Sequence, residues 1–102
     1  MMLLTKANRR DLPPIHSQAS SGDEAVAHVK FFTPDSSWTW YATEFDGIDT
    51  FFGLVMGHET ELGYFSLAEL QRARGPYGLG VERDRHFRPA TLARIRSDRT
   101  AR

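Results

Sequence analysis

The alternation of apolar and polar residues predicts four β-strands in the middle of the chain. The segments concerned are rich in aromatic and β-branched residues, which favour strands. They span residues 26–32, 38–45, 50–56 and 59–65. Residues 33–37 form a turn with proline, aspartate and serine, residues 46–49 begin with Asp-Gly, and residues 57–58 fit a two-residue hairpin. Connections this short join neighbouring strands, so the pattern predicts an antiparallel meander.

Helix signals flank this meander. Thr5 is a typical N-cap for a short helix through Asp11, which two prolines then end. Ser66, followed three residues later by Glu69, has the spacing of a capping box. The helix that begins there is expected to end at Gly75-Pro76, a usual stop sequence.

A single domain is the expected organisation of a chain of 102 residues. A short extended piece near residues 81–87 and a weak helix over residues 91–96 complete the pattern. The predicted fold class is α+β: a four-stranded antiparallel β-meander packed against a capped helix, with short N- and C-terminal helices. Its parts are an N-terminal helix and loop (residues 1–25), the sheet and helix (residues 26–75) and a basic C-terminal segment (residues 76–102).

Turn lengths predict a strand register, and the register assigns side chains to two faces because successive residues alternate along a strand. The predicted opposite pairs are Phe32 with Trp38, Phe45 with Thr50, Tyr41 with Leu54, and Met56 with Glu59. A core face, covered by Leu67 and Leu70, then collects Ala27, Val29, Phe31, Tyr41, Thr43, Phe45, Phe52, Leu54, Met56 and Phe65. The second face collects His28, Lys30, Phe32, Trp38, Trp40, Glu44, Phe51, Val55, Leu62 and Tyr64.

The second face mixes large aromatic side chains with charged ones. In one interpretation the C-terminal segment covers it with Leu79, Val81 and Phe87. In the other it is a partly exposed aromatic groove, which usually marks a binding surface. The candidate binding residues are Lys30, Trp38, Trp40, Glu44, Asp46 and Tyr64.

Composition narrows the classes of protein. The chain has no cysteine, which excludes disulfides, a thiol nucleophile and cysteine-based zinc or iron–sulfur sites. This fits a reducing compartment, and we expect a cytoplasmic protein. Residues 1–4 are too short for the core of a signal peptide, and no run approaches the ~18 apolar residues of a membrane helix. We expect no membrane association and no cofactor.

Charge is distributed unevenly along a chain whose net charge is zero. Between Phe31 and Gln71 there are seven acidic residues and no lysine or arginine, and most of the aromatic residues lie in this stretch. From Arg72 onward, nine arginines accompany three acidic residues. The asymmetry predicts two differently charged surfaces, of which the acidic aromatic one suits a basic protein partner.

Two groups of residues are candidates for catalysis. His28 and Glu44 fall on diagonal positions of the predicted sheet, where a histidine–carboxylate pair can act as general acid and base. The alternative is a structural hydrogen bond between them. In the second group Arg83 would bind an anion with Glu82 or Asp84 as the base, although such runs of alternating charge are mostly solvated.

A metal site is a further hypothesis for the turn at residues 46–49. Glu44, Asp46 and Asp49 could supply oxygen ligands to magnesium or calcium. The alternative is structural, because aspartates in turns usually accept hydrogen bonds from the backbone.

The arginine-rich end favours nucleic-acid binding. The candidate contacts, close in sequence to Tyr77 and Phe87, are Arg83, Arg85, Arg88 and Arg94. The acidic middle argues against the whole sheet as a nucleic-acid platform. Arginine outnumbers lysine eleven to two, which a GC-rich genome would also explain.

Four motifs carry a resemblance to a known family. They are KFFTPDSSWTWYATEFDG (residues 30–47), FFGLV (51–55), ELGYFS (61–66) and VERD (81–84). With them the chain, over roughly residues 3–96, resembles the small bacterial proteins called domain of unknown function 2958. The resemblance implies a setting on plasmids, phages or integrative elements, often among transfer, replication or anti-restriction genes. It implies no catalytic residue, because the family has no established activity.

The leading hypothesis is a small non-enzymatic binding protein of a mobile element. It would engage a protein or nucleoprotein partner through the acidic aromatic face, and antagonism of a host defence system is one version. The alternatives are a small metal-dependent hydrolase or nuclease, and a nucleic-acid-binding accessory protein that uses the basic end. Pairing of two copies through an exposed strand edge would give a homodimer.

Overall fold

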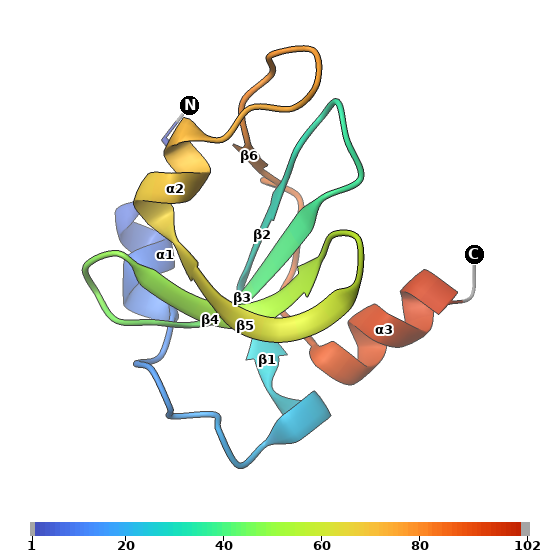
Figure 1. Ribbon diagram of the computed structural model, residues 1–102. Helices are drawn as coiled ribbons and strands as arrows, with labels where there is room; N and C mark the ends of the chain where they lie inside the picture. Colours follow the sequence, from blue (N-terminus) through green and yellow to red (C-terminus); the bar gives the residue numbers. More distant parts are fainter. Residues whose placement is uncertain (1, 101–102) are drawn as a thin grey trace.

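The computed structural model describes residues 2–100, which form short helices and strands around one sheet (Figure 1). The helices are α1 (Lys6–Asp11), α2 (Leu67–Arg72) and α3 (Leu92–Thr100), with a 3-10 turn at Gly22–Glu24. The strands are β1 (Val26–Ala27), β2 (Val29–Phe32), β3 (Thr39–Phe45), β4 (Thr50–Met56), β5 (Thr60–Ser66), β6 (Glu82–Arg83) and β7 (Ala90–Thr91). None of the helices described has the length and apolarity of a membrane span.

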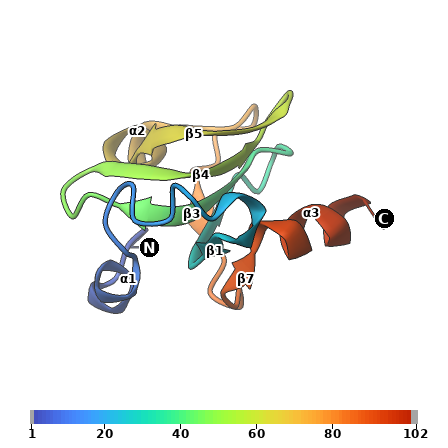
Figure 2. The ribbon, with the colours of Figure 1, turned by 90° about the horizontal axis from the view of Figure 1, so that it is seen from below.

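The sheet confirms the α+β class and extends the predicted meander. Within residues 2–100, five antiparallel strands follow the order β5-β4-β3-β2-β6, so β6 adds a fifth strand beside β2. The first strand predicted, residues 26–32, is divided at His28. Its first part, β1, pairs with β7 in a small ribbon, which brings β7 beneath the sheet (Figure 2).

Both predicted N-caps form, but the structure gives no bond from the Glu69 side chain back to Ser66 that would complete the predicted capping box, and Ser66 instead recruits a distant acid. Thr5 and Asn8 exchange side-chain-to-backbone hydrogen bonds of 3.0 Å at the start of α1. At the start of α2 the Ser66 hydroxyl accepts from the amide of Glu69 (3.2 Å) and donates to Asp49 (2.6 Å). The helix ends at Arg72, three residues before the predicted stop, because the chain is already extended at the next residue.

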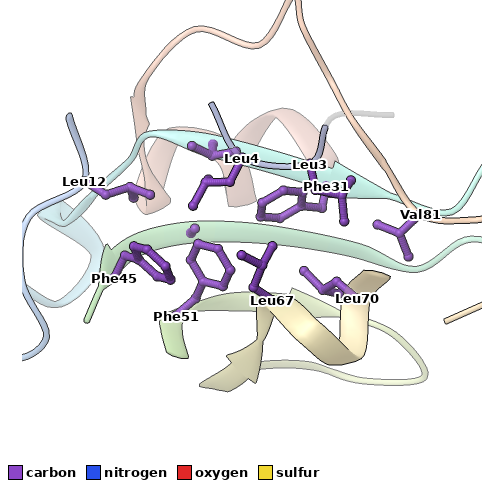
Figure 3. Close-up of a cluster of buried hydrophobic side chains, with 11 residues drawn as sticks. Leu3, Leu4, Leu12, Phe31, Phe45, Phe51, Leu67, Leu70 and Val81 are labelled. Carbon is purple, nitrogen blue, oxygen red and sulfur yellow. The ribbon is translucent and has the colours of Figure 1, made fainter. Parts of the chain in front are cut away.

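One hydrophobic cluster packs α2 and the N-terminal segment against the sheet (Figure 3). Its buried members are Leu3, Leu4, Leu12, Val29, Phe31, Ala42, Phe45, Phe51, Leu67, Leu70 and Val81. Phe31 and Phe51 are fully buried, and their ring centroids lie 5.4 Å apart, edge to face. Trp40 and Phe65 pack against the same cluster. This face is therefore a core and not an open groove.

A second cluster covers the opposite face, under β1, β7 and α3. Its buried members are Ala25, Ala27, Tyr41, Leu54, Met56, Leu92 and Ile95, with Phe87 and Ala90 packed against them. Tyr41 lies between two residues of the first cluster's face along β3, so the clusters lie on opposite faces. The C-terminal segment does not cover one face with Leu79, Val81 and Phe87 as predicted: Val81 packs in the first cluster, Phe87 packs against the second, and Leu79 is exposed.

The predicted register is wrong by one residue at two hairpins. Phe32 lies opposite Thr39, so every side chain of β2 changes face relative to β3. Met56 lies opposite Thr60, because the hairpin contains three residues and not two. Between β3 and β4 the predicted pair of Tyr41 with Leu54 is confirmed, but Phe45 lies opposite Phe51 and not Thr50, because the register shifts between Ala42 and Glu44. The predicted second face is consequently divided between the two real faces.

Candidate functional site

A β-bulge in β3 decides where Glu44 points. The register passes from Ala42 directly to Glu44 while the partner strand advances by one residue. Thr43 is therefore the extra residue, and its hydroxyl donates to the carbonyl of Phe52 at 3.0 Å. A bulge shifts the alternation of the residues that follow. It places Glu44 on the face that carries α3, and Phe45 in the first core cluster.

The carboxylate of Glu44 holds the loop that follows α1. The residue is 2% exposed, and its Oε1 and Oε2 accept the backbone N–H groups of His16 (2.7 Å) and Gln18 (2.8 Å). The side-chain amide of Gln18 donates to the carbonyls of Val26 (3.1 Å) and Thr43 (2.9 Å), and its oxygen accepts from the amide of Val26 (2.8 Å). Two polar side chains thus fix this loop against β1 and β3.

Backbone strain marks the same loop. Among the described residues, His16 is the non-glycine residue with a positive φ, 74°. Histidine tolerates this left-handed region better than most residues, but a cost of order 1 kcal/mol or more is typical. The strained conformation turns the N–H group of His16 toward Glu44. Strain of this kind persists only where surrounding contacts impose it, and it clusters at binding sites.

A cavity of about 270 Å³ opens beside Glu44. Its wall is mostly apolar and comes from Ala25, Phe52, Leu62, Tyr64 and Leu92. Leu62 and Tyr64 stand at the rim on β5, where 43% and 58% of their surfaces are exposed. In the part of the chain described, Glu44 makes no ion pair with a lysine, arginine or histidine. The cavity is therefore an apolar hollow with an acidic end.

The other predicted binding residues do not share this site. Trp38 and Trp40 stack with ring centroids 5.9 Å apart on the opposite face, and both are half-buried. Lys30 pairs with Asp84 at 3.7 Å on the far side of β3. Asp46 lies in the turn after β3. The prediction of one acidic aromatic surface containing all six residues is thus wrong, because the shifts of register separate them; Glu44 and Tyr64 remain together.

His28 and Glu44 do not form the predicted pair. The Glu44 oxygens are occupied by backbone donors, and the charge that acts on His28 is that of Asp11. Burial lowers the pKa of His28, and the carboxylate of Asp11 opposes this shift only in part. Without the pair, the geometry gives no acid–base couple at this position.

The predicted metal site does not assemble. Oδ1 of Asp46 accepts the amides of Ile48, Asp49 and Thr50 at 2.8, 2.8 and 3.0 Å, which lowers the pKa of Asp46. Hydrogen bonds also lower the pKa of Asp49: the largest effect comes from the Ser66 hydroxyl and the next largest from the backbone amide of Ala68. In residues 2–100 no group of three acidic or histidine side chains is placed to hold a metal ion. The structural alternative explains these aspartates.

The second predicted catalytic group is brought together but is used structurally. Glu82, Arg83 and Asp84 line a shallow hollow beside β2. One guanidinium nitrogen of Arg83 donates to the carbonyls of Met2 (2.6 Å) and Leu3 (3.0 Å). Asp84 pairs with Lys30. Arg83 therefore ties down the N-terminal segment, which leaves the proposed anion site without its arginine.

The predicted nucleic-acid contacts line two neighbouring hollows. Arg88 and Arg94 line a second, larger cavity between the sheet and α3. Arg85 lines the neighbouring hollow that also contains Arg83. Three of the four arginines are exposed, whereas Arg83 is half-buried.

Sequence reasoning missed several residues of the Glu44 cavity. His16 and Gln18 lie in a polar stretch that gave no signal beyond a loop. Phe52 was assigned to the core face, whereas in the structure its side chain contributes to the cavity wall. Leu62 was placed on the same predicted face as Glu44 and Tyr64 but was not included among the candidate binding residues.

Together these features define a small α+β domain with an acid-ended apolar cavity on one face of its sheet. A model of the family described as "Protein of unknown function (DUF2958)" matches residues 3–96. The chain belongs to this family, as the resemblance of its motifs predicts. No curated protein and no solved structure matches the chain.

Proposed function

We propose that this protein is a small non-enzymatic binding protein whose Glu44 cavity receives a basic side chain of a partner protein. The observation that supports the proposal most is the buried carboxylate of Glu44, which has hydrogen bonds but no cation among the described residues. A buried charge is costly unless it is paired and hydrogen-bonded. An arginine or lysine from a partner would complete the pairing.

The size and lining of the cavity favour a side chain over a larger ligand. Its volume of about 270 Å³ lies below the range of about 300–1,000 Å³ typical of drug-sized ligands. Phe52, Leu62 and Tyr64 offer an apolar and aromatic wall to the carbon stem of a long basic residue. Tyrosine is also common among the anchors of protein interfaces.

The strand beside the cavity supports the same partner chemistry. β5 is an outer strand of the sheet, so one of its edges is unpaired in the part of the chain described. The exposed acids Glu61 on this strand and Glu59 in the hairpin just before it favour a basic peptide over an acidic one. Pairing of an extended peptide with this edge would bring its side chains to Leu62 and Tyr64.

The setting of this activity is part of the proposal. The resemblance of the motifs favours a plasmid, phage or integrative element in the bacterial cytoplasm, and a host defence protein is one partner of the required chemistry. A second copy of the chain, paired edge to edge along β5, is the competing occupant.

Affinity capture with two tyrosine variants tests the proposal. Tyr64→Ala removes a rim residue that is 58% exposed, and Tyr77→Ala, at a residue that is 85% exposed and outside the cavity, is the matched control. We expect Tyr64→Ala to lose a partner that wild type and Tyr77→Ala retain from a bacterial lysate. Replacing the arginine or lysine of that partner that enters the cavity by glutamine should abolish binding. The proposal fails if all three baits capture the same partners.

A small probe tests the cavity separately. N-acetylarginine methylamide should perturb the NMR signals of Thr43 and Glu44, whereas its neutral citrulline counterpart should not. Equal perturbation by both compounds would contradict the requirement for a positive charge. Sedimentation at increasing concentration distinguishes a partner protein from a second copy, because only self-association depends on the concentration of this chain alone.

A further inference from the structure

A second cavity lies on the other side of β3, on the same face of the sheet. Its volume is about 590 Å³, within the usual range for ligand sites. The sheet contributes Lys30 and Tyr41, the segment before β7 contributes Phe87 and Arg88, and α3 contributes Arg94. Three cations and two aromatic rings thus line one hollow.

The cations of this basic cavity have weak partners or none. Lys30 lies 3.7 Å from Asp84, and Arg94 lies 3.8 Å from Asp98. The Arg94–Asp98 pair is open to solvent and contributes little, so an anion can replace its carboxylate. The Lys30–Asp84 pair is half-buried, and its distance of 3.7 Å lies beyond that of a close charge-assisted hydrogen bond. Within the described residues, no hydrogen bond or ion pair holds the side chain of Arg88.

Aromatic side chains alternate with these cations. The rings of Tyr41 and Phe87 have centroids 5.7 Å apart, and Nζ of Lys30 lies 5.7 Å from the Tyr41 centroid. Lys30 also lines the adjoining hollow of about 350 Å³, which contains Phe32 and Arg85. Two neighbouring hollows therefore share one lysine, and each combines arginine with an aromatic ring.

We infer that these two hollows form a track for single-stranded nucleic acid. A basic groove with interspersed aromatic rings is the chemistry that binds single strands, because cations hold the phosphates while bases stack on the rings. A duplex hides its base faces and cannot use the rings. Arg88 and Arg94 hold phosphates, Phe87 contacts a base, and the chain of the ligand continues past Lys30. This site is separate from the Glu44 cavity and does not depend on the function proposed for it.

Fluorescence anisotropy with a labelled 15-nucleotide oligothymidine tests the track. Each cation that contacts a phosphate should add about 0.7 to the slope of log affinity against log salt. Contacts from Lys30, Arg88 and Arg94 together predict that the affinity falls about 20-fold between 50 and 200 mM salt. Arg88→Ala leaves two of these contacts and should reduce the fall to about 7-fold. Arg72→Ala is the charge-matched control on α2 and should keep the wild-type slope.

Three competing outcomes would overturn the inference. The first is an equal loss of affinity in Arg88→Ala and Arg72→Ala, which would indicate attraction to net charge alone. The second is equal or tighter binding of the matched duplex. The third is binding of thymidine monophosphate as tight as that of the oligomer, which would restrict the site to free nucleotides. Phe87→Leu keeps an apolar side chain in the core and should weaken oligomer binding without changing the salt slope.

Discussion

Replacing Glu44 by alanine should destabilise the protein more than any surface substitution. The change removes two hydrogen bonds from a charged acceptor, of 2.7 and 2.8 Å, at a residue that is 2% exposed. Bonds to charged groups contribute about 1.5–3 kcal/mol each. His16 is exposed, so water can hydrate its backbone amide in the variant and recover part of the lost free energy. We expect a net loss of about 3 kcal/mol, a large part of the 5–15 kcal/mol typical of a domain.

Urea denaturation followed by tryptophan fluorescence measures this loss. With about 1–3 kcal/mol per molar urea, the midpoint should fall by at least about 1 M without a change in slope. Glu44→Gln keeps one acceptor oxygen and should lose about half as much. Glu61→Ala removes an exposed glutamate of β5 and should stay within about 0.5 kcal/mol of wild type.

One result would refute the role of Glu44 as an anchor. If Glu44→Ala matches Glu61→Ala in stability, the carboxylate does not hold the loop of His16 and Gln18. The cavity would then lack a fixed wall, and a charge at its end could not be required for binding.

Three further predictions concern the sheet and its acid sensitivity. Gly53→Ala should cost several kcal/mol in denaturant melts, because a Cβ would lie 1.9 Å from the carbonyl oxygen of Tyr41, whereas Gly63→Ala on the neighbouring strand meets nothing within 4 Å and should be mild. The lowered pKa of Asp49 gives stability that is complete above about pH 3.9 and lost as pH falls through the folded pKa, so Asp49→Asn should flatten acid unfolding. The lowered pKa of His28 makes the unfolded state bind protons more readily below about pH 6.5, so His28→Gln should remove part of the stability loss between about pH 6.5 and 5. Equal stabilities of the two glycine variants, or unchanged pH profiles, would contradict these assignments.

Local signals in the sequence predict local structure well here. The caps at Thr5 and Ser66 were predictable because the groups that satisfy the first turn lie within three residues. The bounds of β4 were predictable because apolar residues fill it between two clear turns. The α+β class follows from the order of these elements.

Long-range geometry was less predictable. One extra residue in the hairpin after Met56 inverts the faces of a whole strand. The composition of a turn does not determine its length to within one residue. The bulge at Thr43 has no glycine or other local signal. The loop residue Gln18 reaches Thr43 across 25 positions of sequence, so no local pattern could connect them. For these reasons the candidate site kept only Glu44 and Tyr64 of its predicted members.

The extra residue at Thr43 has a consequence for the comparison of relatives. A chain shorter by one residue at this point would turn its acid toward the first hydrophobic cluster and its phenylalanine toward the cavity. An aligned glutamate alone would then say little about a shared site. The spacing between the tryptophan pair and that glutamate is the better diagnostic, because it determines which side of the sheet receives the charge.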